Sequence, residues 1–259
     1  MKTKYKVTEV KLHISDKNSK MGKIANFSTL PGNSEHMLYV KGELLTDVPG
    51  TCTGNCEGCF NNCYAVKSCK LHHNKCIEAW GENTLLLRSG GLEEAVDAYI
   101  KSINENPRRK AKIEYFRINC SGEVESAADL EVWNNIAQKN PSVKFGIYTK
   151  NYEALTEFMD KYGDSAKNFV INISQWHHLA DNIIEKYKGK LNVFEYDDSQ
   201  LKNNELSEED KARLEKTVHC PAVTKKGKHA KNSKGEDITC ISCTRCYQKR
   251  GRTTAVYAH

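Results

Sequence analysis

The sequence predicts an α/β protein in which a parallel sheet forms a partial (β/α)6 barrel. Short apolar runs rich in β-branched and aromatic residues, such as 112–119 and 143–148, predict strands. Amphipathic segments of helical period alternate with these runs, and this alternation implies right-handed crossovers between parallel strands. We count about six strands, too few for the eight-stranded barrel. An open curved sheet and a doubly wound fold are the alternatives.

Each element follows from its local pattern. Helices are expected where apolar residues recur every three or four positions, most clearly in the segment with Leu92, Val96 and Ile100. In chain order, the strands are expected at 37–40, 112–119, 143–148, 169–173, 191–196 and 253–257. The helices are expected at 63–88, 92–103, 126–136, 155–162, 179–187 and 207–217.

The composition is that of an ordinary globular protein. The chain has 259 residues, of which 39% are hydrophobic and 28% charged. Its apolar runs are too short for a membrane span, and its first residues lack the apolar core of a signal peptide. We therefore expect a cytoplasmic protein without membrane contact, in which the 11 cysteines bind metal rather than form disulfides. The net charge of +6 permits contact with nucleic acid without demonstrating it.

Four cysteines lie close together after the first expected strand. Cys52, Cys56 and Cys59 have the spacing C-x3-C-x2-C, and Cys63 follows after three more residues. Thiolates at such short spacing select an iron–sulfur cluster, zinc or cuprous copper. We call these four residues the first cysteine set. Buried or disulfide-bonded cysteines are the structural alternative.

A second cysteine set lies near the carboxyl terminus. Cys240, Cys243 and Cys246 have the spacing C-x2-C-x2-C, and Cys220 is followed by a proline. This resembles a ferredoxin pattern with the Cys-Pro placed first, and it predicts a [4Fe–4S] cluster. A structural zinc site is the alternative. The basic segment Lys225–Arg252 could contact the backbone of a nucleic acid, or it could be a solvated loop.

These patterns divide the chain into three segments. Residues 1–36 are expected to be a β or irregular segment, and residues 37–205 the partial barrel with the first cysteine set. Residues 206–259 are expected to hold the second cysteine set and the last strand.

Polar residues follow the expected strands, where parallel α/β proteins place their active sites. The candidates for catalysis are Glu123, Lys150 and His177, each on a loop after a strand. A solvated carboxylate, a helix cap and a loop histidine are their structural alternatives. Cys120 and the terminal His259 also lie at strand ends, and their roles stay open.

The first cysteine set resembles that of the radical S-adenosylmethionine superfamily. There, three cysteines hold a [4Fe–4S] cluster, and its remaining iron binds S-adenosylmethionine. Ser121-Gly122-Glu123 resembles the Gly-Gly-Glu segment that binds the amino group of this cofactor. Two departures are Gly58, where an aromatic residue is common, and Cys63, which could fill the open iron site.

The closer resemblance is to the phage "gene product 88" domain family. It implies a phage or mobile-element origin and iron–sulfur binding, but no reaction. It also implies that Cys52, Cys59 and Cys63 are the ligands and that Cys56 is a spare. The resemblance rests on residues 18–31, Cys52, Cys63-Tyr64-Ala65, Arg117, Ser121-Gly122-Glu123, Tyr148-Thr149-Lys150, the second cysteine set and Tyr257-Ala258-His259.

Together these patterns predict an iron–sulfur protein with one or two [4Fe–4S] clusters and radical S-adenosylmethionine-like chemistry. In that interpretation Gly122 and Glu123 orient the cofactor, Lys150 and His177 face the substrate, and the second cluster relays electrons from a donor or anchors substrate. The alternative is a non-enzymatic iron–sulfur or zinc protein that binds nucleic acid or a host partner.

Overall fold

The fold is organised by one six-stranded sheet in which every pair of neighbours is parallel. The computed structural model describes residues 3–16, 21–54, 57–176, 178–199, 206–226 and 228–257. The strands succeed one another in the order β1 (Ala25–Asn26), β4 (Tyr115–Arg117), β5 (Lys144–Thr149), β6 (Phe169–Gln175), β7 (Asn192–Asp197) and β8 (Thr253–Tyr257). The predicted α/β class and parallel sheet are therefore confirmed. The doubly wound alternative is wrong, because the strand order never reverses.

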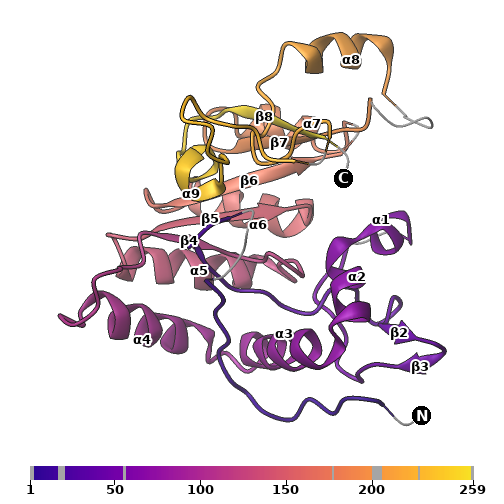
Figure 1. Ribbon diagram of the computed structural model, residues 1–259, viewed down its shortest axis with the longest axis vertical. Helices are drawn as coiled ribbons and strands as arrows, with labels where there is room; N and C mark the ends of the chain where they lie inside the picture. The colour runs from indigo at the N-terminus through magenta and orange to yellow at the C-terminus, as the bar shows by residue number, and fades with distance from the viewer. Residues whose placement is uncertain are drawn as a thin grey trace.

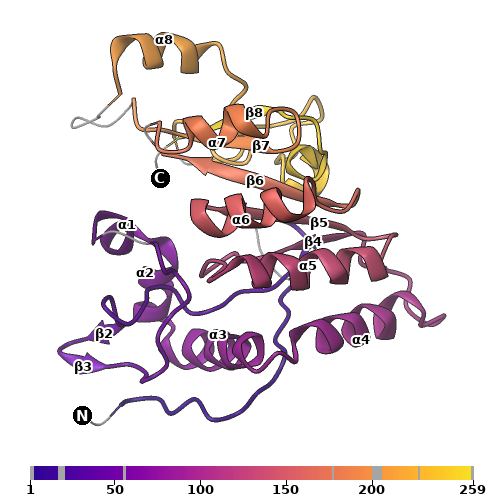
Figure 2. The same ribbon diagram turned by 180° about the vertical axis from the view of Figure 1, so that it is seen from behind.

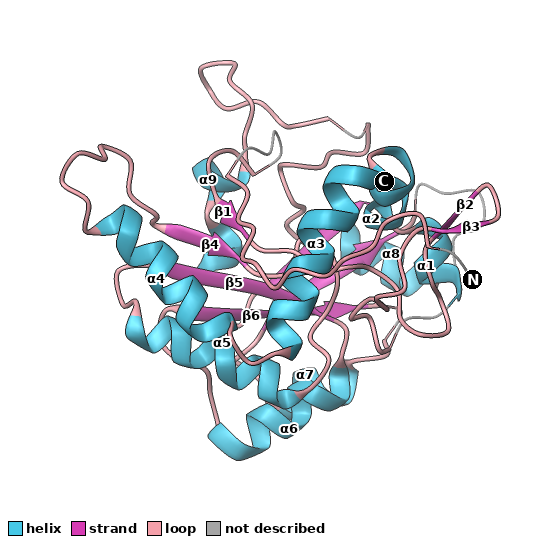
Figure 3. Cartoon of the chain, turned by 90° about the horizontal axis from the view of Figure 1, so that it is seen from below, coloured by secondary structure: helices cyan, strands magenta, loops and turns pink. Residues whose placement is uncertain are grey.

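Helices cover one face of this sheet, which we call the helix face (Figure 3). They are α4 (Leu92–Asn104), α5 (Ala127–Lys139), α6 (Tyr152–Tyr162) and the short α7 (Asp181–Lys186). The main hydrophobic core lies between these helices and the strands. Trp133 of α5 is its largest side chain, in edge contact with Phe27 at 5.3 Å and 5.8 Å from Phe116 of β4.

The first strand of the sheet was predicted wrongly. The expected strand at 37–40 lies outside the sheet, where β2 (Tyr39–Val40) pairs antiparallel with β3 (Glu43–Leu44). The sheet begins instead with β1. The reason is burial, because Phe27, just after β1, is fully buried, whereas Tyr39 is 42% exposed. Two strand residues are too few to show an alternating pattern.

The expected helix at 63–88 is two helices, preceded by a third. These are α1 (Glu57–Asn62), α2 (Tyr64–Leu71) and α3 (His73–Arg88), with a break at His72, whose φ of −122° and ψ of 48° are not helical. They gather with the β2–β3 hairpin at one end of the molecule (Figures 1 and 2). Cys63 lies just before α2 in an extended conformation and so joins α1 to α2.

The carboxyl-terminal segment covers the second face of the sheet, which we call the cysteine face. It contains α9 (Cys240–Cys243) and the 3-10 turn η1 (Arg245–Tyr247). Tyr247 packs so tightly on Gly146 of β5 that a Cβ there would lie 2.8 Å from its ring. Asn172 and Asn192 donate hydrogen bonds to the carbonyls of Cys246 and Gln248, at 3.2 and 3.0 Å. The second cysteine set is thus fixed to the sheet.

The sheet takes strands from all three segments expected from the sequence, and the division into 1–36, 37–205 and 206–259 stays a prediction. The helix expected at 207–217 is α8 (Glu208–Glu215), which begins after Ser207 as predicted. The Ser207 hydroxyl accepts a hydrogen bond from the Asp210 amide at 3.0 Å. Within the described ranges, no helix has both the length and the apolar character to cross a bilayer.

Candidate metal centre

The thiols of Cys52, Cys59 and Cys63 lie near one another at the carboxyl edge of the sheet. Burial, together with the nearby charges of Glu123, Cys63 and Cys59, raises the pKa of the Cys52 thiol to about 12. These are the three ligands that the family resemblance implies. Cys56 lies outside the described residues, so its role as a spare stays a prediction.

Two threonines join the loop of Cys52 to the segment Ser121-Gly122-Glu123. The hydroxyls of Thr29 and Thr51 are hydrogen bonded at 2.8 Å, and Thr51 also accepts from the Glu123 amide at 2.9 Å. Gly122 has a φ of +78°, and a Cβ there would lie 1.9 Å from the Thr29 hydroxyl oxygen. Only glycine therefore fits, for steric and conformational reasons alike.

The carboxylate of Glu123 links the ends of β4 and β5. Its two oxygens accept hydrogen bonds from the Lys150 amide at 2.8 Å and the Val124 amide at 2.9 Å. Burial raises the pKa of Glu123, while these hydrogen bonds and the Lys150 charge lower it. The Thr149 side chain also hydrogen bonds with this carboxylate, and the acceptor positions that remain could still bind a ligand ammonium group.

Lys150 extends toward the first cysteine set. Its ammonium nitrogen lies 4.0 Å from the sulfur of Cys59 and 4.5 Å from the centre of the Trp176 ring, which stacks on Tyr196 at 4.2 Å. The structure thus brings Glu123 and Lys150 together, as expected. His177, the third predicted catalytic residue, lies outside the described residues.

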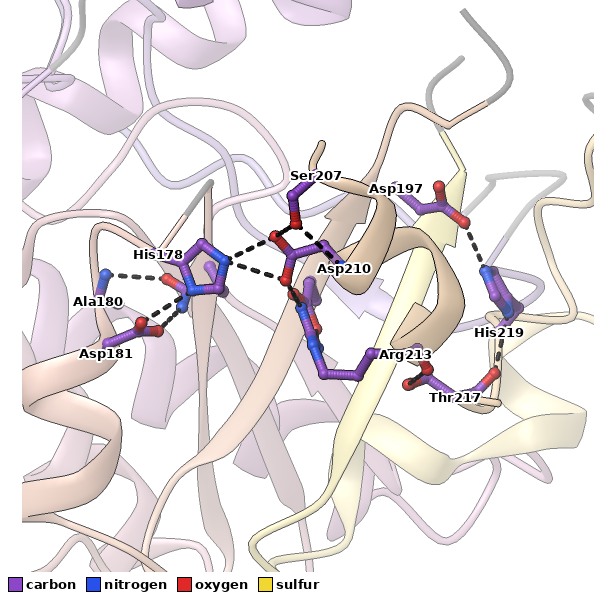
Figure 4. A network of polar contacts seen from close by, with 11 residues as sticks. His178, Ala180, Asp181, Asp197, Ser207, Asp210, Arg213, Thr217 and His219 are labelled. Carbon is purple, nitrogen blue, oxygen red and sulfur yellow. Dashed lines mark hydrogen bonds and ion pairs between the residues drawn. The ribbon is translucent and has the colours of Figure 1, made fainter. Parts of the chain in front are cut away.

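The neighbouring His178 belongs to a separate polar network that holds α8 (Figure 4). Its ring nitrogens face the carboxylates of Asp181, at 2.8 Å, and Asp210, at 3.0 Å. Asp210 also accepts from Arg213, which pairs with Glu195 of β7. These contacts attach α8 to the sheet.

Two buried polar atoms at the end of β4 lack a hydrogen-bond partner among the described residues. They are Asn119 Oδ1 and Ser121 Oγ, in side chains only 6% and 4% exposed. Asn119 also has a φ of +50°, a conformation that costs energy outside glycine. A buried polar group without a partner costs about 1–3 kcal/mol. Both atoms therefore fit a site that a polar group of a bound molecule completes.

Three thiols of the second cysteine set, those of Cys220, Cys240 and Cys246, lie near one another. Burial raises the pKa of the Cys246 thiol to about 11; a hydrogen bond with Tyr148 lowers it, and the charges of Cys220 and Cys240 raise it. Cys220 is fixed by its amide, which donates to the Ala255 carbonyl of β8 at 2.8 Å, and Cys243 ends α9. Residues from three separate elements thus bring thiols together.

Both cysteine sets have the chemistry that an iron–sulfur cluster needs. The described cysteines of both sets are partly exposed, several of their thiols lie near one another, and soft thiolates are the ligands that such clusters prefer. Among the described residues, no three His, Cys, Asp or Glu side chains are arranged around a single ion. In a cluster each thiolate binds a different iron, so the ligands stand farther apart than around one zinc ion.

The other cysteines have different surroundings. Cys69 is fully buried, and its thiol hydrogen bonds with Cys76, which raises the pKa of Cys69 and lowers that of Cys76. Both pack between α2 and α3 against Ile77. The Cys120 thiol donates to the sulfur of Met21 at 3.7 Å. His259 lies outside the described residues.

In the basic segment Lys225–Arg252, some side chains are exposed to solvent, such as Lys225, and others are bound within the protein. Arg245 donates to the Thr254 hydroxyl at 2.8 Å, and Lys249 donates to Ser165 at 3.0 Å. Lys225, in contrast, lies 5.5 Å from the ring of Tyr257, which stacks on His219 at 4.1 Å.

Arg117 of β4 lies at the candidate site, and the sequence analysis named it only in the family resemblance, without a chemical role. Its guanidinium lies 3.6 Å from the centre of the Tyr148 ring, on the cysteine face. The signal was present in the alternation of the strand, because Phe116 and Ile118 are fully buried on the helix face and leave Arg117 on the other. The alternation predicts the sheet face of a side chain but not which loops contact that side chain.

Comparison with protein-family models finds a match over most of the chain. A family model described as gene product 88 matches residues 11–249. Nothing among curated proteins or solved structures matches the chain. Because the matched region covers most of the sequence, the chain belongs to the gene product 88 family.

Proposed function

We propose that this protein, of phage or mobile-element origin, is a cytoplasmic iron–sulfur protein built on a partial barrel of the radical S-adenosylmethionine type. Cys52, Cys59 and Cys63 hold the first cluster, and the second cysteine set holds an auxiliary cluster in the carboxyl-terminal extension. The observation that carries this proposal is the convergence of the first three thiols beside Ser121-Gly122-Glu123, at the carboxyl edge of a parallel sheet in sequential order.

The chain's own residues would bind and orient S-adenosylmethionine. The buried Ser121 hydroxyl would hydrogen bond its amino group, and the free acceptor positions of Glu123 would compensate that group's positive charge. Lys150 would lie next to both the first cluster and the substrate. When bound, the first cluster supplies one electron that breaks a C–S bond of the cofactor, and the second passes electrons from a donor protein.

An anaerobic count of iron and sulfide tests the clusters. After reconstitution we expect about eight irons per chain. Changing Cys52, Cys59 or Cys63 to Ser should each remove about half of this iron. Cys56→Ser and the control Cys76→Ser should leave the iron content unchanged. Dithionite and S-adenosylmethionine should then give 5′-deoxyadenosine. A folded, iron-free protein would disprove the whole proposal, and loaded protein that forms no 5′-deoxyadenosine would disprove its catalytic part.

A second candidate function, a non-enzymatic iron–sulfur or zinc protein that binds nucleic acid, is favoured by a surface pocket. This pocket of 500 Å³ is lined by Lys225, Lys226, Tyr257 and His219, among others. Lysines can pair with phosphates and the stacked rings with a base. The affinity of the protein for single-stranded DNA should fall as the salt concentration rises. At one salt concentration, the Lys225→Glu/Lys226→Glu variant should bind more weakly than the wild type, and the control Lys188→Glu should bind equally well. Metal analysis separates iron from zinc.

A further inference from the structure

We propose that Arg117 binds an anionic group, a carboxylate or a phosphate, of a molecule that lies between the two cysteine sets. The proposal stands on the surroundings of one side chain. If the proposed function holds, this molecule is the substrate, and only that identification rests on the proposed function.

The guanidinium of Arg117 is held in a fixed plane. It lies 3.6 Å from the centre of the Tyr148 ring, and its Nε donates to the Ile118 carbonyl at 3.2 Å. Stacking and this hydrogen bond together fix both the height and the rotation of the group. The two terminal nitrogens can form the fork that pairs with carboxylate or phosphate.

This fork has no acceptor within the described part of the chain. No hydrogen bond or ion pair joins its terminal nitrogens to any described residue, and the titratable groups that face Arg117 include Tyr148, Cys120, Tyr247, Tyr64 and Cys246. Burial raises the pKa of the three tyrosines, so these phenols carry no charge near pH 7. No carboxylate of the described residues therefore pairs with this cation.

Two other arginines differ in this respect. Arg213 pairs through two nitrogens with Glu195, and Arg88 pairs through two with Glu125. Removing a charge from water without a partner is costly, so the unpaired fork of Arg117 lowers stability unless an anion completes it. A residue held in this way is pre-organised for a ligand rather than for the fold.

The residues around Arg117 indicate where that ligand would bind. Tyr64 follows Cys63 at the start of α2, and the titratable groups facing it include Arg117, Cys63 and Cys52 of the first set. Arg117 also faces Cys246 of the second set. Tyr64 is 57% exposed, so solvent reaches this region. An anion on Arg117 would thus lie near residues of both cysteine sets.

Isothermal titration calorimetry with inorganic phosphate and, separately, with acetate tests the proposal on the full anaerobic chain. Arg117→Gln should weaken the binding of one of these anions about tenfold or more, and Arg117→Lys should weaken it less. Lys144→Gln is the matched control. It removes a positive charge from the same sheet face, where Lys144 lies 5.7 Å from Tyr115, and should change the affinity less than about twofold. The anion that binds identifies the group.

A second measurement needs no variant. Phosphate or acetate should protect Arg117 of the wild-type chain from phenylglyoxal, as measured by peptide mass spectrometry, while exposed Arg250 should react unchanged. Protection confined to Arg117 supports the site. Absence of binding by the wild type, equal binding by Arg117→Gln, or an effect of that variant on cluster reduction potential alone would each overturn it. Iron counted in the same samples tests the proposed function separately.

Discussion

The two faces of one sheet have opposite characters. On the helix face, Phe116, Phe145 and Ile171 are at most 1% exposed and pack against helices. On the cysteine face, the same strands present Arg117, Tyr148, Asn172 and Asn192, and a cysteine-bearing segment covers them through hydrogen bonds to its backbone carbonyls. One face therefore holds the fold together by apolar burial, and the other places polar groups around a candidate site.

This difference shows how a parallel sheet can be covered on both faces and still place polar side chains around a candidate site. Strands covered on both faces usually consist of nearly continuous apolar residues. Here β6 alternates Phe169, Ile171 and Ile173 with Val170, Asn172 and Ser174. The polar members serve to position the covering segment rather than to bury apolar area. Changes on the two faces should accordingly have different consequences.

The largest expected effect is on the helix face. Trp133→Ala should lower the free energy of unfolding by about 3–5 kcal/mol, because it leaves a cavity between α5 and β4. Urea denaturation measures the change. The control Tyr162→Ala removes a 45% exposed aromatic residue from the same layer and should cost about 1 kcal/mol. If Trp133→Ala instead abolished iron binding in its folded fraction, the separation of the two faces would be wrong.

Gly122→Ala should lower the free energy of unfolding by about 2–4 kcal/mol, because the new methyl group meets the Thr29 hydroxyl and φ is +78°. Gly163→Ala separates the two causes. Gly163 has a φ of +70° with open space around its Cβ position, so its change should cost only about 1 kcal/mol. Thermal unfolding of both variants gives the comparison, and equal costs would contradict a steric role for Thr29.

Gly146→Ala should lower the free energy of unfolding by about 1–2 kcal/mol, since the added methyl group displaces Tyr247 from the cysteine face. The double variant with Tyr247→Ala should show a smaller additional cost than the single change, which a double-mutant cycle measures. Additive costs would mean that the two residues do not meet in solution.

The smallest expected effect is a pH dependence of α8. Hydrogen bonds with Asp210 and Asp181 raise the pKa of His178, so its contribution is complete below about pH 6.5 and is lost as pH rises through the raised value. Bonding to His178 lowers the pKa of Asp210, so that contribution is complete above about pH 4 and is lost as pH falls through the lowered value. Attachment of α8 should be strongest between these limits.

The side chain of His178 is 52% exposed, so the effect should be below about 1 kcal/mol. Protection factors of the α8 amides at pH 5.5 and pH 8 measure it, and His178→Gln should remove the difference. A larger protection at pH 8 would show that another contact holds α8.

The candidate site could be predicted only in part. Glu123 and Lys150 were found because parallel strands bring their carboxyl ends to one edge, whatever the details of packing. The surroundings of Arg117 were missed, because only the folded chain brings Tyr64 of α2 and Cys246 of η1 to it. The first strand was missed because Ala25–Asn26 is too short for a period to be visible.

The sequence by itself determined the parallel α/β class, most strand and helix positions, and the thiol chemistry of both cysteine sets. These depend on residue type and on spacing within a few turns of chain, which neighbours in sequence fix. Only the tertiary structure decided that β1 opens the sheet, that the carboxyl-terminal segment covers the cysteine face, and that Tyr64 and Cys246 both face Arg117. Such contacts join residues far apart in sequence, and their geometry is set by packing of the whole chain.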